Sequence, residues 1–216
     1  TPEQKLAFVK ALKKQGKTVG MTGDGVNDVL ALRDADCSVA MASGSEAASN
    51  ASMLVLMDSD FSKMPSVVSE GRRVVNNIQK AASLYLTKNI FSLLLAVFSV
   101  INVLKYPLKP SQITLISMFT IGVPSFILSL EPNFDRIKGR FLSNVFKMAL
   151  PAGITMFISV SSLVVFGQVF NITAECISTS STMLVALVGF LYLGKVAQPI
   201  NRLHLGMMAI LIAGMA

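Results

Sequence analysis

The segment Thr22–Asp28 brings together residue types that hold phosphate and magnesium. It reads Thr22-Gly23-Asp24-Gly25-Val26-Asn27-Asp28. Asp24 and Asp28 offer the hard carboxylate oxygens that Mg²⁺ prefers, and glycines let a backbone turn sharply and approach a ligand closely. This composition predicts a phosphate and magnesium site. The simpler interpretation is an acidic, glycine-rich turn in which Asn27 and Asp28 cap the next helix.

The surrounding sequence predicts an alternating α/β segment over residues 1–61. Leu6, Val9 and Leu12 recur at helical spacing, and short apolar runs bounded by turn residues indicate buried strands. The expected helices cover residues 3–15, 28–35 and 45–52, and the expected strands cover residues 17–22, 37–41 and 53–56. This alternation favours a parallel sheet flanked by helices, and the small number of strands indicates part of a doubly wound domain.

Residues 81–216 have the composition of a membrane bundle. Hydrophobic residues make up 52% of the 216-residue chain, and its mean hydropathy is +0.61. A continuous helical stalk over residues 62–80 is expected to lead into the first apolar run. The predicted spans cover about 81–104, 113–130, 145–166, 182–193 and 205–216.

The formal net charge of +7 indicates a lipid bilayer as partner rather than nucleic acid. Much of the positive excess lies at the ends of apolar runs, Trp is absent, and no basic cluster is interleaved with stacking aromatic residues. The links after the second and fourth predicted spans carry Lys and Arg. Positive charge marks the cytoplasmic side of a membrane, so we expect a multi-pass protein with these links and the N-terminal segment in the cytoplasm.

The segment Thr22–Asp28 resembles the TGDGVND signature of P-type ATPases, which belong to the haloacid dehalogenase (HAD) superfamily. Similar flanking pieces stand at Pro2–Lys5, Val39–Met41 and Glu70–Arg72, so the resemblance spans essentially the whole chain. It implies a partial HAD-like, Rossmannoid phosphorylation domain joined by a helical stalk to an α-helical polytopic transmembrane bundle. Among P-type ATPases, the chain is most similar to the bacterial calcium-pump branch.

The resemblance also implies roles for the residues of the motif. Asp24 is expected to bind Mg²⁺, Asn27 to touch the phosphoryl group, and Asp28 to hold the Mg²⁺ shell and a nearby lysine. Lys5 is expected to neutralise phosphoryl charge, although a lysine at the start of an amphipathic helix is otherwise an ordinary surface residue. The implied cofactors are Mg²⁺ and ATP, with ATP bound mainly by other domains. The remaining residues of the expected phosphate loop are Thr22, Gly23 and Gly25.

Other parts of such an ATPase are expected to lie outside the chain. No Asp-Lys-Thr occurs in the sequence, although related pumps carry their nucleophilic aspartate in that motif. The chain begins without Met and stops inside an apolar run, so both ends look cut. We therefore expect a C-terminal portion whose partner is the missing N-terminal part of the same pump. Alone, this portion is expected to be inactive.

Polar residues in the first two predicted spans are candidates for binding a transported cation. Asn89 and Thr120 match ion-site positions of calcium-pump relatives, and a primary amide is costly in lipid. Pro124, beside Gly122, predicts a helix break whose free carbonyl could face a cavity. Hydroxyl groups in membrane helices also commonly bond to their own helix, which is the alternative interpretation. The other candidates are Ser92, Asn102 and Ser117.

Neither span contains a carboxylate. Calcium-pump relatives carry one in the fifth helix and an aspartate after the position of Thr120, where this chain has Ile121. Two divalent ions would lack balancing negative charge on these helices, unless acids on a missing fourth helix provide it. We therefore expect transport of a metal cation, with Ca²⁺ favoured and at most one divalent ion per cycle, across a bacterial plasma membrane. Lys88 is expected to extend its ammonium to the cytoplasmic interface, the alternative being a built-in positive charge.

Three other functions compete with this one. A P-type pump of lipid or polyamine would suit uncharged middle helices. A soluble HAD-type phosphatase uses a similar loop to hold Mg²⁺, but the apolar spans weigh against it. A non-catalytic membrane protein would make the acidic turn incidental, and the predicted strand, turn and helix around that turn disfavour this interpretation.

Overall fold

The computed structural model describes residues 1–215 and divides into two compact units. The first unit, Thr1–Val68, contains strands and short helices, and the second unit, from Ser69 onward, is helical. The last residue of the predicted span 205–216 lies outside the described residues. At this level, the predicted combination of a small parallel sheet with apolar helices is confirmed.

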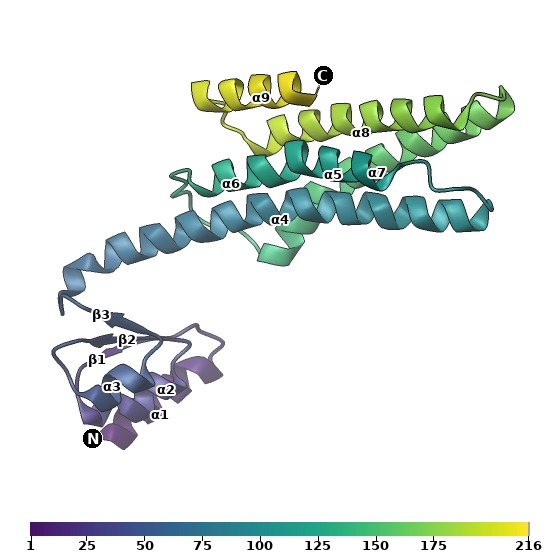
Figure 1. Ribbon diagram of the computed structural model, residues 1–216. Helices are drawn as coiled ribbons and strands as arrows, with labels where there is room; N and C mark the ends of the chain where they lie inside the picture. The colour runs from purple at the N-terminus through teal and green to yellow at the C-terminus, as the bar shows by residue number, and fades with distance from the viewer. Residues whose placement is uncertain (216) are drawn as a thin grey trace. The chain divides into compact units, whose positions relative to one another are not determined.

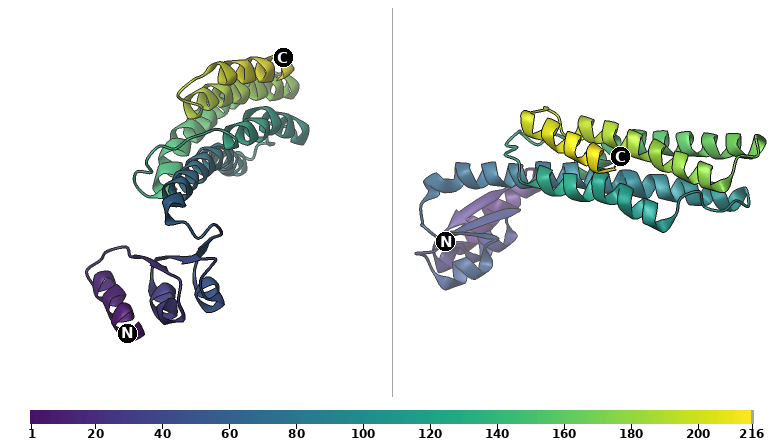
Figure 2. Two further views of the ribbon diagram at one scale, coloured as in Figure 1. Left: turned by 90° about the vertical axis from the view of Figure 1, so that its left-hand side faces the viewer. Right: turned by 45° about the horizontal axis from the view of Figure 1, so that its top comes forward.

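The first unit is built on a three-stranded parallel sheet with the strand order β1-β2-β3. Its helices lie on one face of this sheet, as Figures 1 and 2 show. Since α2 and α3 return the chain between successive parallel strands, the carboxyl ends of the three strands meet at one edge. The strands are β1 (Gly20–Gly23), β2 (Cys37–Met41) and β3 (Leu54–Leu56), and the helices are α1 (Pro2–Lys14), α2 (Val29–Asp34) and α3 (Glu46–Ala51).

Small side chains let the helices of this unit pack closely on the sheet. Ala31 of α2, Ala40 of β2 and Ala48 of α3 are fully buried. Leu32 packs with the last two, and Val9 of α1 packs with Ala31 in a second cluster. Burial of these apolar groups holds the sheet edge in place, and this edge carries the predicted phosphate loop.

Most element ends in the first unit differ from the sequence prediction by one residue, and the start of β1 differs by three. β1 begins at Gly20 rather than at Lys17, because the ladder with β2 starts where Gly20 faces Cys37. α2 begins at Val29 rather than at Asp28, because residues Val26–Asp28 form a 3₁₀ turn that leads into it. These differences lie at element ends, where tertiary partners decide the boundary.

The second unit consists of packed helices, shown from two sides in Figure 2. α7 packs along α8, and α9 lies beside α8. Four helical stretches are long and apolar enough to cross a membrane, namely Phe61–Ile101, Pro110–Ser129, Phe141–Val169 and Ala174–Val196. The helices are α4 (Met64–Ile101), α5 (Pro110–Ser117), α6 (Val123–Ser129), α7 (Phe141–Val169), α8 (Ala174–Val196) and α9 (Arg202–Met215).

Side chains of the second unit are apolar on both the inside and the outside. Leu95, Leu128, Val160 and Leu193 are fully buried between helices. Other large apolar side chains, such as that of Leu93, are exposed. A helix that is apolar on its inner and outer faces is typical of a membrane span.

The helix ends in the second unit also differ from the predicted span limits. α4 ends at Ile101, and α8 begins at Ala174 although apolar residues predicted a span only from residue 182. Several Ser and Thr residues lower the hydropathy of the first half of α8, but they do not disturb the helix. For example, Thr182 Oγ1 donates to Ser178 O over 2.8 Å, and Ser178 Oγ donates to Gln112 Oε1 over 2.8 Å.

Candidate functional site

The predicted phosphate loop lies at the carboxyl end of β1. The chain leaves β1 at Gly23, forms the 3₁₀ turn Val26–Asp28 and enters α2. Ser45 N, at the start of α3, donates to Asp24 O over 2.7 Å and holds this turn against the connection that follows β2. In α/β sheets, ligands bind outside the carboxyl ends of the strands, and the loop occupies such a position.

Lys5 and Asp28 form an ion pair at this turn. Lys5 Nζ lies 2.5 Å from Asp28 Oδ1, and Gly25 N donates to Asp28 Oδ2 over 3.4 Å. The Asp28 side chain is 8% exposed, whereas the Lys5 side chain is 50% exposed. The hydrogen bond from Lys5 lowers the pKa of Asp28 and outweighs burial, which acts in the opposite direction. Asp28 is therefore a carboxylate at neutral pH and holds one ammonium group at the loop.

Close contacts explain two glycines around the loop. A side chain at Gly23 would place its Cβ 2.5 Å from Asp28 Cβ, and one at Gly44 would place its Cβ 2.3 Å from Asp24 O. Both distances are too short for atoms that are not bonded to each other, so the turn requires glycine at both positions. At Gly25, the nearest atom to an added Cβ would be Asp28 Oδ2 at 3.8 Å, which is an ordinary contact.

The donor set of the loop fits Mg²⁺. Thr22, Asp24 and Asn27 are exposed beside the buried Asp28. Asp24 presents a carboxylate to solvent, whereas both oxygens of Asp28 already accept hydrogen bonds. Because Mg²⁺ keeps waters and uses only one or two protein carboxylates beside phosphate oxygens, a direct contact with Asp24 suffices. Asp28 is placed to orient Lys5. Across residues 1–215, no group of three or more His, Cys, Asp or Glu side chains gathers as a denser metal site.

The second unit contains a small cavity between α4, α5, α7 and α8 and the turn that joins α5 to α6. Its volume is ≈ 40 Å³. One water needs roughly 10–15 Å³ measured in this way, so the cavity has room for a small ion or a few waters. Within the part of the chain that the structure describes, no Asp or Glu lines it. Its polar lining residues are Thr87, Lys88, Ser117, Thr120 and Tyr192.

The hydroxyl groups of Ser117 and Thr120 donate to their own helix. Ser117 Oγ donates to Ile113 O over 2.6 Å, and Thr120 Oγ1 donates to Ile116 O over 2.7 Å. Each hydroxyl oxygen keeps lone pairs that can accept a further bond or contact a cation. Each of these two hydroxyl groups can therefore donate a hydrogen bond within its own helix and also bind a cation through its oxygen.

The other predicted cation-site residues lie outside the cavity. Asn89 is exposed on α4. Ser92 Oγ lies 3.4 Å from Tyr106 Oη, within hydrogen-bonding distance. Asn102 Nδ2 donates to Phe98 O over 2.8 Å at the end of α4. The structure thus brings Ser117 and Thr120 together at the cavity and leaves Asn89, Ser92 and Asn102 apart from it.

The helix break predicted before Pro124 is wrong, because the chain forms a wider helical turn there instead of breaking. The helix continues from α5 to α6 through a π turn over Met118–Gly122, with Thr120 and Ile121 buried inside the unit. Proline lacks the N–H that would bond to the preceding turn, and a wider turn accommodates this loss. Single π turns occur frequently at functional sites.

Sequence reasoning missed Thr87 and Tyr192, and Lys88, for which the membrane interface was expected, is among the residues that line the cavity. The signal in α4 was available, because Leu84, Thr87, Lys88 and Phe91 follow the i, i+3, i+4, i+7 spacing of one helix face, and all four line the cavity. For Tyr192 no sequence signal distinguishes a cavity position from ordinary packing.

Comparison with known proteins gives relatives in one protein family, although no family model matches the chain. The calcium-transporting ATPase CtpE of Mycolicibacterium smegmatis is 47% identical over 72% of this chain and 21% of that protein. The probable cation-transporting ATPase exp7 of Streptococcus pneumoniae is 41% identical over 92% of this chain and 27% of that protein. CtpE of Mycobacterium bovis is 39% identical over 100% of this chain and 28% of that protein. The chain spans between 21% and 28% of the length of these relatives.

Proposed function

Because this chain belongs to the P-type cation-transporting ATPases, we propose that it supplies part of the phosphorylation site and part of the cation pathway of a pump with an aspartyl-phosphate intermediate. The observation that carries the proposal is the Lys5–Asp28 pair beside the exposed Asp24 at the carboxyl end of β1. This arrangement supports phosphoryl chemistry, since it offers one fixed ammonium and one accessible carboxylate.

Lys5 and Asp28 act on the negative charge of the phosphoryl group. That charge must be neutralised both when an aspartyl-phosphate forms and when it is hydrolysed. Lys5 contributes a positive charge, Asp28 fixes its position, and the exposed Asn27 amide can donate to a phosphoryl oxygen. Mg²⁺, when held by Asp24, supplies further positive charge. The sequence contains no Asp-Lys-Thr, so the nucleophile and the ATP site belong to other parts of the full-length protein in this proposal.

The proposed division of the chain follows from these roles. Residues 1–61 form the C-terminal part of an HAD-like phosphorylation domain in the cytoplasm. Residues 62–80 form a stalk, and residues 81–216 form a transmembrane domain in a bacterial plasma membrane. The parallel sheet and the four helices long and apolar enough to cross a membrane support this division.

The transported substrate in this proposal is a metal cation, with Ca²⁺ favoured by the names of the relatives. The ≈ 40 Å³ cavity supports a small ion over a lipid or polyamine, because sites for drug-sized ligands occupy roughly 300 Å³ or more. The cavity lining contains Lys88 and, within the described residues, no carboxylate. The excess of positive over negative charge in this lining supports at most one divalent ion per cycle.

Phosphorylation of the full-length pump from radiolabelled ATP tests the proposed function. Asp24→Ala should lower cation-dependent phosphorylation and ATP hydrolysis by about a hundredfold or more. Asp58→Ala, which changes an exposed aspartate outside the loop, is the matched control and should leave both unchanged. Wild-type activity in Asp24→Ala would show that the acidic turn is incidental.

The substrate is tested separately. Hydrolysis of ATP by the full-length pump is measured with Ca²⁺, Mg²⁺, Mn²⁺ and K⁺ in turn, and Ca²⁺ should stimulate it most. Transport into sealed vesicles should then give at most one Ca²⁺ per ATP. A ratio of two Ca²⁺ per ATP would contradict the limit of one divalent ion.

A further inference from the structure

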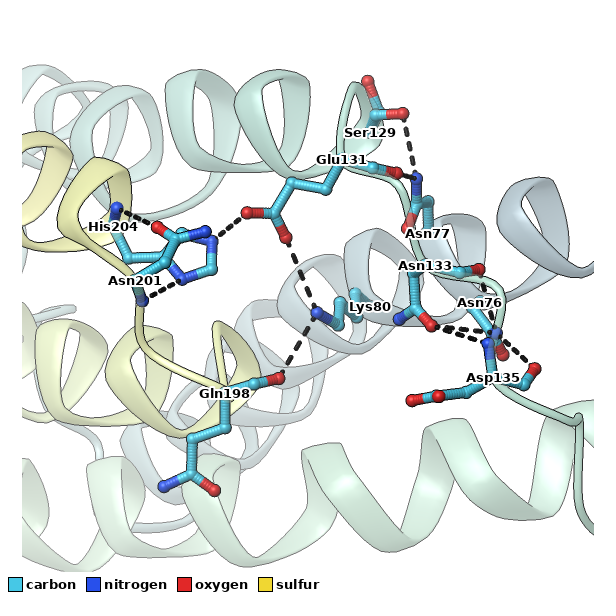
Figure 3. Close-up of polar contacts among 10 residues, drawn as sticks. All are labelled: Asn76, Asn77, Lys80, Ser129, Glu131, Asn133, Asp135, Gln198, Asn201 and His204. Atoms are coloured by element: carbon cyan, nitrogen blue, oxygen red, sulfur yellow. Dashed lines mark hydrogen bonds and ion pairs between the residues drawn. The ribbon is translucent and has the colours of Figure 1, made fainter.

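A cluster of polar side chains outside both candidate sites connects α4 to the segment that follows α6 (Figure 3). Asn77 Nδ2 of α4 donates to Ser129 O over 3.0 Å and to Glu131 O over 2.8 Å. The neighbouring Asn76 Nδ2 donates to Asp135 O over 2.9 Å. The last carbonyls of a helix have no partner within it. The Asn77 amide supplies one for Ser129 O and thereby fixes the end of α6 on α4.

Glu131 joins this connection to a third element. Its Oε2 lies 3.8 Å from Lys80 Nζ, and its Oε1 contacts His204 Nε2 of α9. The side chains of Glu131, Lys80 and His204 are 15%, 12% and 2% exposed. A largely buried carboxylate needs such partners, because removal of one partner leaves charge without compensation. Glu131 therefore holds α4 and α9 to the segment after α6.

His204 is fixed in orientation by the start of α9. Asn201 Oδ1 accepts from His204 N over 2.8 Å, and His204 Nδ1 accepts from Asn201 N over 3.4 Å. This is the reciprocal pattern of a capping box, with histidine in the place of the usual glutamate or glutamine. Because Nδ1 accepts a hydrogen bond, the neutral ring carries its proton on Nε2, which faces Glu131.

Two of the elements that this cluster connects, α4 and the helical stretch Pro110–Ser129, also contribute walls of the candidate cation cavity. α4 carries both Asn77 and Thr87, and the helical stretch Pro110–Ser129 carries both Thr120 and Ser129. A displacement of α4 near Asn77 therefore acts on the end of α6, and through that helix on the cavity wall that contains Thr120. Packed helices transmit such displacements as rigid bodies.

We propose that Glu131 is a positioning residue for cation transport. With Asn77, Lys80 and His204, it fastens the end of α6 to α4 and α9, so that two walls of the cavity move together during the cycle. The inference rests on the proposed pump function. A merely structural role makes a different prediction, namely that loss of Glu131 lowers the amount of folded pump but leaves each folded molecule normal.

Transport per active molecule tests the inference. The full-length pump is reconstituted in lipid vesicles, and Ca²⁺ uptake is divided by the phosphoenzyme formed from radiolabelled ATP, which counts folded pumps. Glu131→Gln should lower Ca²⁺ uptake per phosphoenzyme about two- to thirtyfold. Glu175→Gln changes an acid in the first turn of α8 that is exposed and outside the cluster, and should behave as wild type.

A second variant separates the contact with Glu131 from capping of α9. His204→Gln keeps a side-chain acceptor for Asn201 N but removes the imidazole that contacts Glu131. It should lower uptake per phosphoenzyme in the same direction, and it serves as the test if Glu131→Gln does not fold. The double variant should be no worse than Glu131→Gln alone, because both changes remove one interaction.

Two results would overturn the inference. One is unchanged Ca²⁺ uptake per phosphoenzyme in Glu131→Gln or, where that variant does not fold, in His204→Gln. The other is full additivity of the two losses, which would show that the residues act independently. If the wild-type pump forms no cation-dependent phosphoenzyme, the proposed function itself fails, and this outcome is distinguishable from the other two.

Discussion

Lys5 Nζ lies 2.5 Å from Asp28 Oδ1, although 23 positions separate the two residues along the chain. The contact joins the first turn of α1 to the turn that follows β1. It brings a positive charge to a loop that otherwise presents an acidic side chain to solvent. The position of the Lys5 ammonium therefore depends on Asp28, and Asp28 in turn depends on the absence of a side chain at Gly23.

Replacing Asp28 with Asn should destabilise the first unit at neutral pH and much less in acid. The folded-state pKa of Asp28 lies below the ordinary value of 3.8. Its stabilising contribution is therefore fully present above about pH 3.8 and is lost as the pH falls through the lower folded-state pKa. Thermal unfolding of wild type and Asp28→Asn, followed by circular dichroism from neutral to acidic pH, measures the difference. A stability difference between the two proteins that does not change with pH would contradict the assignment of this contribution to the ionised Asp28 carboxylate.

Gly23→Ala should disrupt the loop, whereas Gly20→Ala in the same strand should be tolerated. The added Cβ would lie 2.5 Å from Asp28 Cβ at position 23, but its nearest neighbour at position 20 is Cys37 O at 4.0 Å. Overpacking of this kind costs about 1–3 kcal/mol. Unfolding free energies of the two variants, with phosphorylation of the full-length pump as a second measurement, provide the comparison. Equal effects would show that glycine flexibility, rather than contact with Asp28, is required.

The strand, turn and helix around the candidate phosphate loop were predictable because its glycines, carboxylates and flanking elements are contiguous in sequence. The pairing of Lys5 with Asp28 was expected only through resemblance to a family, since nothing in an amphipathic helix identifies which lysine folds back onto a distant turn. The Gly44 contact with Asp24 was missed for the same reason. Close backbone approach between two loops is a tertiary property.

The second unit was predicted less completely. Hydropathy locates apolar helices but does not show which face of a helix meets a cavity, so Asn89 was selected although it is exposed, and Thr87 was missed. The contact of Glu131 with His204 joins a link between helices to the start of α9. The residues next to Glu131 and His204 in the sequence do not predict this contact, because it forms only when the helices pack together.

Thr120→Val should weaken cation binding in the full-length pump by about tenfold, since it replaces an oxygen at the cavity with a methyl group of similar size. Thr155→Val on α7 is a matched control, because Thr155 Oγ1 also donates to its own helix, to Pro151 O over 2.8 Å, but the residue is exposed. The Ca²⁺ concentration for half-maximal phosphorylation measures the effect. Equal shifts in the two variants would assign Thr120 to helix packing alone.

Lys88→Gln should strengthen cation binding, because Lys88 is the cationic residue among the polar side chains that line the cavity. An ammonium and a Ca²⁺ ion about 6 Å apart repel each other by roughly 5–6 kcal/mol at an effective dielectric constant of about 20. Water that enters the cavity would screen part of this repulsion. We therefore expect the Ca²⁺ concentration for half-maximal phosphorylation to fall by about tenfold.

The matched control for Lys88→Gln is Lys105→Gln, which removes an exposed lysine from the link between α4 and α5, away from this cavity. It should leave the Ca²⁺ requirement unchanged. If Lys88 instead extends its ammonium to the membrane surface, Lys88→Gln will resemble this control, because charge at the surface is strongly screened by water and salt. A selective gain in Ca²⁺ affinity would therefore locate the Lys88 charge at the cavity and support the proposed limit of one divalent ion per cycle.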